Sequence, residues 1–259
     1  MEKAAEMGKN RTGIDMSPMQ SKEMLSGAEE FSAVEQERQA MEPEFVYPGI
    51  VAIDTQYIRE SDPVGSVPVP GTLKGALKSG LKKAGGHNPE VFLNKLGERL
   101  AYERSGVRMY EAVITKCEAA DDAHPAGPVT AEELRHIRDE EAEHFVLLKE
   151  AMQQLGADPT AQTPDADVSG VAGMGMMQVL NDPRTNMSQC LEVLLTLELA
   201  DNAAWELLIS LAQELRMDEL VEQFQEALTQ EEEHVLRVRS WYEEMVMSQS
   251  AGKRVEVTH

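Results

Sequence analysis

Four long stretches of the chain repeat apolar residues at three- and four-residue spacing, a pattern that predicts four amphipathic helices packed as a bundle. We expect these helices over residues 88–120, 130–155, 188–216 and 218–247. The first begins with an Asn88 cap followed by Pro89, and the second begins at Thr130, whose TAEE sequence forms a capping box with Glu133. For the fourth helix, Asp218 is the expected cap.

The lengths of the connections predict how the helices are joined. The links between the first and second helices and between the third and fourth are short, whereas the link from Gly156 to Met187 has about 30 residues rich in Gly, Pro, Asp and Met. Short, long, short is the pattern of two helical hairpins joined by one crossover. The sequence therefore predicts an all-α protein whose main domain is a four-helix bundle over residues 88–248.

The residues outside the bundle are less regular. Residues 1–42 are polar and weakly periodic, which predicts a flexible arm. Residues 43–87 are expected to pack on the bundle as an extended, proline-rich segment followed by a short basic helix over Thr72–Ala84. Residues 249–259 form a C-terminal tail.

Charge and composition exclude several classes of function. The chain has 46 acidic and 24 basic residues and a net charge of −22, which disfavours nucleic acid and anionic membranes as partners. No apolar run is long enough to span a bilayer, and the N-terminus has no signal-peptide core. Two cysteines without a CxxC motif exclude cysteine zinc sites. We therefore expect a cytoplasmic protein with Cys117 and Cys190 as buried thiols.

Polar residues interrupt the apolar face of each predicted helix near its middle. The second and fourth helices each carry a Glu-x-x-His motif, and the glutamate and histidine of the motif lie one turn apart on the same face of the helix. The six residues are Glu103, Glu141, His144, Glu198, Glu231 and His234. None of the four apolar faces includes Lys or Arg, so four converging carboxylates would repel one another unless two divalent cations neutralised them. Carboxylates with imidazoles suit iron or manganese.

The two predicted hairpins also resemble each other in sequence. Glu103-x6-Tyr110-Glu111 aligns with Glu198-x6-Trp205-Glu206, and the alignment continues to place Glu141 and His144 over Glu231 and His234. This internal repeat predicts a pseudo-twofold site with three ligands from each half.

With the ligand positions, the repeat and the crossover in place, residues 88–248 resemble the ferritin-like superfamily of di-iron carboxylate proteins, which includes rubrerythrins, bacterioferritins and manganese catalases. The resemblance implies a ferritin-like four-helix bundle with an irregular N-terminal extension. It also implies that Glu103 and Glu198 are terminal ligands, that Glu141 and Glu231 bridge two metals, and that His144 and His234 each bind one. The cysteine pairs of a rubrerythrin-like electron-transfer domain are absent, and the N-terminal residues fall outside the common pattern, so the subfamily stays open.

The implied function is a redox protein with two Fe ions, or alternatively Mn or mixed Mn/Fe, that reacts with dioxygen or hydrogen peroxide as a ferroxidase or peroxide scavenger. Three alternatives remain: a di-iron oxygenase with an organic substrate, a manganese-catalase-like dismutase, and a non-catalytic metal-binding protein. A deep apolar tunnel beside Gly106 would favour the oxygenase. Catalytic residues beyond the ligands stay open, no organic cofactor is expected, and a homo-oligomer is left open.

Several further residues are candidates for supporting roles. Tyr102 and Tyr110 flank Glu103 and are candidates to donate hydrogen bonds to it, although core packing is the simpler interpretation. Asp201 is a hydrogen-bond partner of the ligands or a spare ligand, and Gly106 either leaves space for a small molecule or serves helix packing. The remaining residues considered are interpreted as packing or surface residues: Met174, Met176, Met177, His87, His124, His136 and His259.

Overall fold

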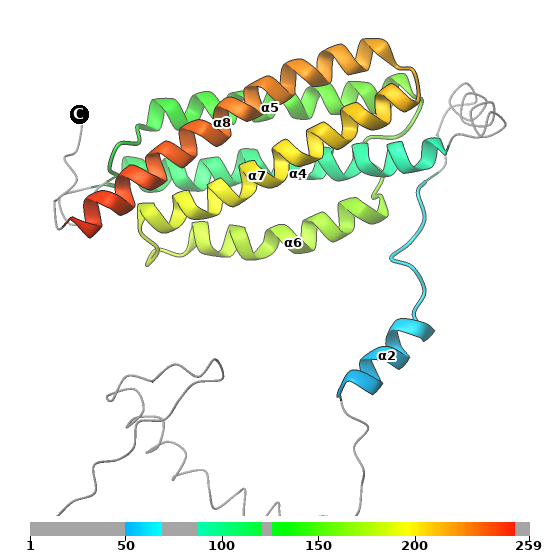
Figure 1. Cartoon of the computed structure of the whole chain (residues 1–259), viewed down its shortest axis with the longest axis horizontal. Coiled ribbons are helices and arrows are strands. Elements are labelled where there is room, and N and C mark those ends of the chain that lie inside the picture. The colour runs from blue at the N-terminus through cyan, green and yellow to red at the C-terminus, as the bar shows by residue number, and fades with distance from the viewer. Residues whose placement is uncertain (1–49, 69–87, 121–125, 252–259) are drawn as a thin grey trace, which may run out of the picture. The chain divides into compact units, whose positions relative to one another are not determined.

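The computed structural model describes residues 50–68, 88–120 and 126–251, and within these residues it contains six helices and no strand. The chain divides into two compact units, Met1–Ser61 and Asp62–His259. The described helix of the first unit is α2 (Ile50–Glu60). The second unit contains α4 (Pro89–Glu118), α5 (Ala131–Gln154), α6 (Pro164–Asn181), α7 (Met187–Glu214) and α8 (Asp218–Ser250), which are shown in Figure 1.

The sequence analysis predicted an extended segment where the structure contains helix α2. Pro48 and Pro63 lie outside the helix, so no proline interrupts the hydrogen bonds between residues 50 and 60. The Thr55 hydroxyl donates to the carbonyl of Val51 at 2.6 Å. The predicted arm and the predicted basic helix lie outside the described residues, as do His87, His124 and His259. Packing of the N-terminal segment on the bundle stays a prediction.

Two antiparallel hairpins build the bundle. Helices α4 and α5 pair in the first hairpin and α7 and α8 in the second, and the hairpins meet through contacts of α4 with α7 and of α5 with α8. The Thr130 side chain caps α5 by accepting the backbone N–H of Glu133 at 3.2 Å. Helix α8 begins with Asp218 as its first helical residue, after Met217 at the cap position, so the predicted cap is displaced by one residue.

The long crossover contains a helix that the sequence analysis treated as a link. Helix α6 begins at Pro164 after the Thr163 cap, and it packs along α4 and α7 (Figure 1). Its Gly-rich sequence disfavours a helix by about 1 kcal/mol per glycine relative to alanine. Burial of Leu180 in the core and polar contacts with α4 at both ends of the crossover offset that preference. At the first end, Asp165 pairs with Lys95 at 2.8 Å. At the other, the Lys116 ammonium donates to the carbonyl of Asp182 at 2.6 Å.

The apolar core of the bundle consists of two clusters on either side of a polar layer. One cluster includes Tyr110, Ile137 and Trp241, and the other includes Phe92, Leu148 and Phe224. Met176 and Met177 pack against the first cluster, as expected for packing methionines. Cys190 is buried and Cys117 is partly buried, and both are free thiols. Among the described helices, none combines the length and apolar character needed to cross a membrane.

The close approach of α4 and α6 gives a first prediction. A Cβ on Gly97 would lie 2.5 Å from the Thr163 hydroxyl oxygen, which is held in place as the cap of α6. We expect Gly97→Ala to lower the free energy of unfolding, because overpacking costs about 1–3 kcal/mol and improved helix propensity offsets only about 1 kcal/mol of that. Urea denaturation followed by circular dichroism measures the change.

Gly175→Ala is the matched control for this substitution. A Cβ on Gly175 meets nothing within 4 Å, and the residue lies inside α6. The same chemical change should therefore raise stability by about 0.5–1 kcal/mol through helix propensity alone. Equal effects of the two substitutions would show that the contact between Gly97 and Thr163 does not limit the packing of α6.

Candidate metal centre

The polar layer between the two apolar clusters brings together all six residues singled out in the sequence. Helices α4 and α7 contribute one glutamate each, and α5 and α8 contribute the two Glu-x-x-His motifs. The exposed fraction is 0% for Glu103, Glu141, Glu198 and Glu231 and 2% for His144 and His234. Helical spacing explains this convergence, because each residue lies on the apolar face of its own helix at the same level of the bundle.

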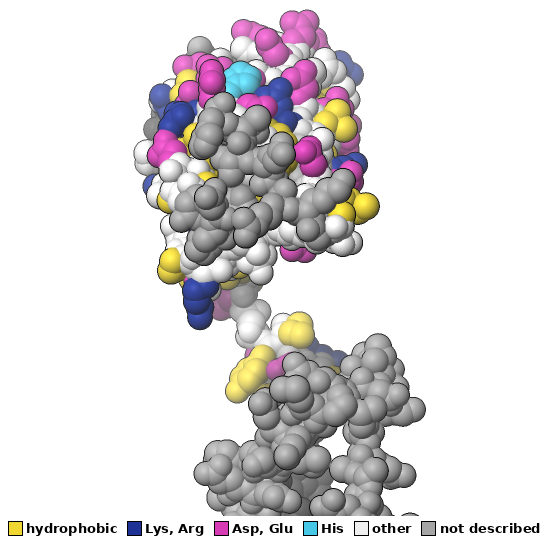
Figure 2. Space-filling view, turned by 90° about the vertical axis from the view of Figure 1, so that its left-hand side faces the viewer, with side chains coloured by type: hydrophobic (Ala, Val, Ile, Leu, Met, Phe, Trp, Pro, Cys, Tyr) yellow, Lys and Arg dark blue, Asp and Glu magenta, His cyan; other side chains and the backbone are white. Residues whose placement is uncertain are grey.

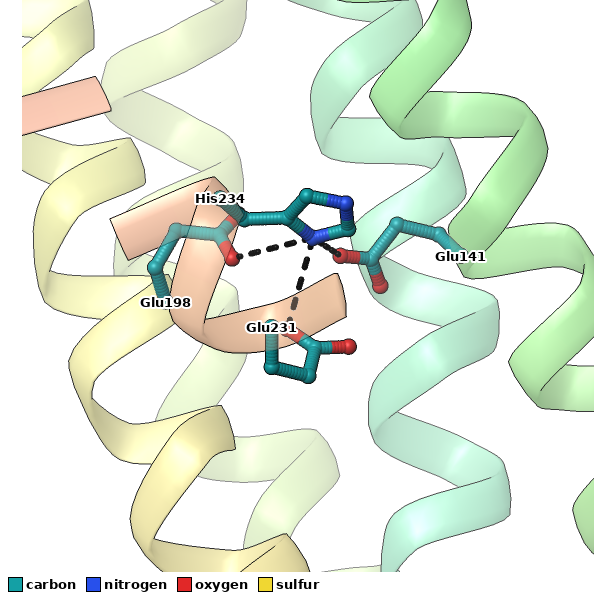
Figure 3. Close-up of side chains that lie close together, drawn as sticks. All are labelled: Glu141, Glu198, Glu231 and His234. Atoms are coloured by element: carbon teal, nitrogen blue, oxygen red, sulfur yellow. Dashed lines mark ion pairs between the residues drawn. The ribbon is translucent and has the colours of Figure 1, made fainter. Parts of the chain in front are cut away.

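Glu231 lies at the centre of the cluster and faces both histidines. One of its carboxylate oxygens is 2.7 Å from Nδ1 of His144, and the other is 3.4 Å from Nδ1 of His234. Figure 3 shows that the His234 Nδ1 is surrounded by three carboxylates. Besides Glu231, these are Glu198 at 3.6 Å and Glu141 at 3.7 Å.

The candidate ligand atoms of the described residues fall into three overlapping groups. Within each group, the candidate ligand atoms all lie within 4.8 Å of one another. The first group is Glu141, Glu198, Glu231 and His234, and the second is Glu103, His144 and Glu231. A third group joins Glu103, Glu141 and Glu231 to Asp201. The carboxylates of Glu141 and Glu231 thus reach toward both ends of the cluster.

Each ligand candidate at the ends of the cluster has one atom fixed by the protein and one atom left without a hydrogen bond. Glu103 accepts from Arg99 on Oε1, whereas its buried Oε2 has no hydrogen-bond partner among the described residues. Glu198 accepts from the Tyr110 hydroxyl on Oε1, and its Oε2 is likewise unsatisfied. A buried polar atom without a hydrogen-bond partner loses its solvation without compensation, so these inner oxygens are available to a cation.

The two histidines follow the same rule through their Nε2 atoms. His144 Nε2 lies 2.8 Å from the amide oxygen of Gln230, and His234 Nε2 lies 2.9 Å from the carboxylate of Glu140. Both acceptors require a proton on Nε2, so Nδ1 of each imidazole carries the lone pair in the neutral form and faces the glutamates. The sequence analysis missed Glu140 and Gln230. Their signal was available, because each directly precedes the glutamate of a Glu-x-x-His motif.

Arg99 corrects the expectation that no cation lies on the apolar faces. It is 2% exposed and pairs with Glu103 at 2.7 Å, one helical turn away, and also with Asp201 across the bundle. Asp201 therefore does contact the cluster through a hydrogen-bond partner of Glu103. The guanidinium also lies 4.3 Å from the ring centre of Tyr102. The i, i+4 spacing from Glu103 was the sequence signal for this arginine.

Tyr110 lies in the apolar core and Tyr102 packs against it, which agrees with the simpler interpretation of both tyrosines. Neither tyrosine donates to Glu103: Tyr110 donates to Glu198, and Tyr102 donates to the carbonyl of Leu197 at 2.9 Å. A Cβ on Gly106 would lie 2.7 Å from Oε2 of Glu141. The Glu141 carboxylate therefore occupies the space beside Gly106, which favours the packing interpretation of this glycine over room for a small molecule.

The charges of the buried layer match two divalent cations. Five buried carboxylates, counting Asp201, and one guanidinium leave four negative charges when both histidines are neutral. Burial raises the pKa of Glu141, and the neighbouring Glu231 and Glu103 carboxylates raise it further. Burial alone would lower the pKa of His234, but the carboxylates of Glu141, Glu198 and Glu231 around its Nδ1 raise it far above its ordinary value. The cluster therefore attracts protons strongly in the absence of other cations.

Acidic side chains elsewhere on the bundle are solvated. Figure 2 shows acidic and basic side chains spread over one face of the molecule, with hydrophobic side chains in scattered spots. Glu143 lies two residues from Glu141 and is exposed, and Glu232 and Glu233 are exposed beside Glu231. His136 is also exposed, as expected. Burial, more than acidity, distinguishes the cluster.

Comparison with known proteins agrees with this architecture. The family model described as Ferritin-like domain matches residues 93–247, which is more than half of the chain and includes all six clustered residues. The searches of curated proteins and of solved structures found no match.

The buried arginine gives a second prediction. We expect Arg99→Met to lower the free energy of unfolding of the chelator-treated protein by about 3–5 kcal/mol, because it leaves Asp201 and Glu103 buried beside each other without their cation. Adding Asp201→Leu should recover part of the loss, since it removes one of the unpaired charges. Chemical denaturation of the single and double variants measures the interaction.

Arg135→Met is the control, because Arg135 pairs with Glu118 where both side chains are about half exposed. Exposed pairs contribute little, so stability should stay nearly unchanged. An Arg99→Met effect as small as that of Arg135→Met would contradict a stabilising role for the buried pair.

Proposed function

This chain belongs to the ferritin-like domain family, and we propose that its buried cluster binds two iron ions and reacts with dioxygen or hydrogen peroxide. In this proposal, Glu103 and His144 form one end of the site, the His144 position. Glu198 and His234 form the other end, the His234 position. Glu141 and Glu231 are shared between the two positions.

The observation that carries the proposal is the position of Glu231 between the histidines. Its two oxygens face two different Nδ1 atoms, at 2.7 and 3.4 Å. A carboxylate shared in this way is suited to bridging two cations, and a single ion would leave one imidazole without a partner. The unsatisfied inner atoms of Glu103 and Glu198 support one further ligand at each end.

The donor set favours iron or manganese over a structural zinc ion. Four carboxylates and two imidazoles are hard to borderline ligands, whereas closed zinc sites use thiolates or more histidines. The same ligands suit manganese, so a manganese-catalase-like reaction is the second candidate. The oxygenase alternative loses one expected support, because the Glu141 carboxylate fills the space beside Gly106.

Bound iron would supply one-electron redox chemistry with dioxygen or peroxide. The residues of the chain prepare the site for it. Tyr110 and Arg99 fix the outer oxygens of Glu198 and Glu103, and the bonds to Nε2 orient both imidazoles. The two apolar clusters limit the access of water to the layer, which strengthens the interaction of its carboxylates with cations.

The proposal predicts two bound divalent ions per chain. Glu141→Ala and Glu231→Ala should each remove most of this capacity, because a shared carboxylate serves both ions. Glu143→Ala and Glu232→Ala are matched controls on the same two helices and should bind two ions as the wild type does. Elemental analysis after equilibrium dialysis against Fe(II) under argon gives the stoichiometry.

Thermal melting of the same samples gives an independent readout. Ligand binding to the folded state alone adds about 2.7 kcal/mol of stability at a hundredfold excess over Kd, so the metal should raise the Tm of the wild type and of the controls. Two tightly bound ions in the Glu141→Ala/Glu231→Ala double variant would refute this ligand assignment.

The redox part of the proposal has a separate test. After anaerobic loading with two Fe(II) per chain, stopped-flow mixing with dioxygen or with hydrogen peroxide should give an increase in near-ultraviolet absorbance faster than that of Fe(II) in buffer. The ratio of the two rates distinguishes a ferroxidase from a peroxide scavenger. If the wild type oxidises Fe(II) no faster than the Glu231→Ala variant does, the redox part of the proposal is wrong and the protein only binds metal.

A further inference from the structure

The two histidines of the cluster have different partners behind them. His234 donates from Nε2 to a carboxylate, that of Glu140, at 2.9 Å, whereas His144 donates to an amide oxygen, that of Gln230, at 2.8 Å. The two partners occupy corresponding places, each one residue before the glutamate of its Glu-x-x-His motif. The ligands at the two ends are thus the same in type, but their supporting residues are not.

The side chains of His144, Gln230, Glu140 and His234 form one network of hydrogen bonds, in which the donors all lead toward Glu140. The Gln230 amide N–H donates to Glu140 at 3.3 Å, which turns its oxygen toward His144. Every donor in the network therefore points toward Glu140: His234 directly, and His144 through Gln230. The side chain of Glu140 is 19% exposed, so solvent reaches it only in part.

The difference in partner changes how strongly each imidazole binds a cation. A carboxylate behind the N–H of a ligating histidine increases the electron density on the other nitrogen and makes it a more basic ligand. An amide oxygen has no net charge and has a weaker effect. His234 is therefore the stronger donor of the two, and its position also receives the negative charge of Glu140.

The terminal carboxylates also have different hydrogen-bond partners. Glu103, at the His144 position, accepts from the guanidinium of Arg99, a full positive charge that repels a second cation. Glu198, at the His234 position, accepts from the neutral Tyr110 hydroxyl. Asp201 pairs with the same guanidinium and offsets its charge, and one of its oxygens lies within 4.8 Å of oxygens of Glu103, Glu141 and Glu231. The difference between the partners of the two histidines therefore carries the preference for the His234 position.

We propose that the two metal positions are unequal, that the His234 position binds a divalent cation more tightly and fills first, and that Glu140 and Gln230 set this order as positioning residues. This inference rests on the proposed function, because it requires two ions at the cluster. It goes further by assigning which ion is tightly held and which one exchanges.

Anaerobic calorimetric titration of the full chain with Co(II), which does not undergo the redox reaction, tests the order of filling. The wild type should bind two ions in two resolved steps, with dissociation constants about 10–100-fold apart, the range that hydrogen-bond partners of ligands commonly control. His234→Gln should abolish the tighter step, and His144→Gln should abolish the weaker one. Circular dichroism establishes that each variant is folded.

The exchange variant Glu140→Gln/Gln230→Glu gives the sharper test. It keeps one carboxylate, one amide and the net charge while reversing their places between the histidines. In this background, His234→Gln should no longer weaken Co(II) binding more than His144→Gln does. A purely structural role for these residues would not move the preference from one end to the other. Glu143→Gln, an exposed neighbour on α5, controls for charge and should leave both steps unchanged.

The outcomes separate this inference from the function on which it rests. Two Co(II) ions bound with equal affinity would overturn the inequality while leaving a dinuclear site intact. An unchanged order in the exchange variant would overturn the role of Glu140 and Gln230. Failure of the wild type to bind two ions of either Co(II) or Fe(II) would refute the proposed function itself.

Discussion

Five carboxylates buried with one guanidinium in the interior of a helical bundle are the constraint on which this structure depends. Each of the four long helices contributes a carboxylate at the same level, between two apolar clusters that exclude water. Buried carboxylates repel one another strongly at low dielectric, and hydrogen bonds alone do not remove that repulsion. The layer therefore needs cations, whether protons or metal ions, and the rest of the bundle supplies the apolar packing that holds the layer together.

The protein meets this constraint from outside the cluster. Arg99, Tyr110, Glu140 and Gln230 each bind the outer atom of a ligand candidate, and the inner atoms of Glu103, Glu198 and both histidines are left without hydrogen bonds. A core selected for stability alone would satisfy its inner polar atoms or replace them with apolar groups. The protein thus fixes the outer atoms of these side chains. The inner atoms stay available to a ligand that several side chains share.

Helical periodicity made the bundle and the six clustered residues predictable. The apolar face of a long amphipathic helix packs against the core, so Glu103 and Glu231 could be assigned to the interior from their spacing alone. Helix α6 was missed because its glycines argue against a helix, and only contacts with α4, such as that of Lys95 with Asp165, reveal why it forms. Arg99 was missed for a related reason. Its burial depends on Asp201, which is distant in sequence.

The residues around the cluster break the symmetry that its ligands suggest. In the alignment of the two hairpins, Glu103 matches Glu198, but Arg99 matches Leu194, Gly106 matches Asp201 and Tyr110 matches Trp205. Substitution of a ligand side chain would abolish the proposed shared metal site. Substitution of a residue that hydrogen-bonds to a ligand would change only the affinity of one end of the site for a cation. In the proposed dinuclear site, the clustered residues would hold two cations. The surrounding residues give the two ends different hydrogen-bond partners, which is how one buried layer would assign separate tasks to two ions of the same element.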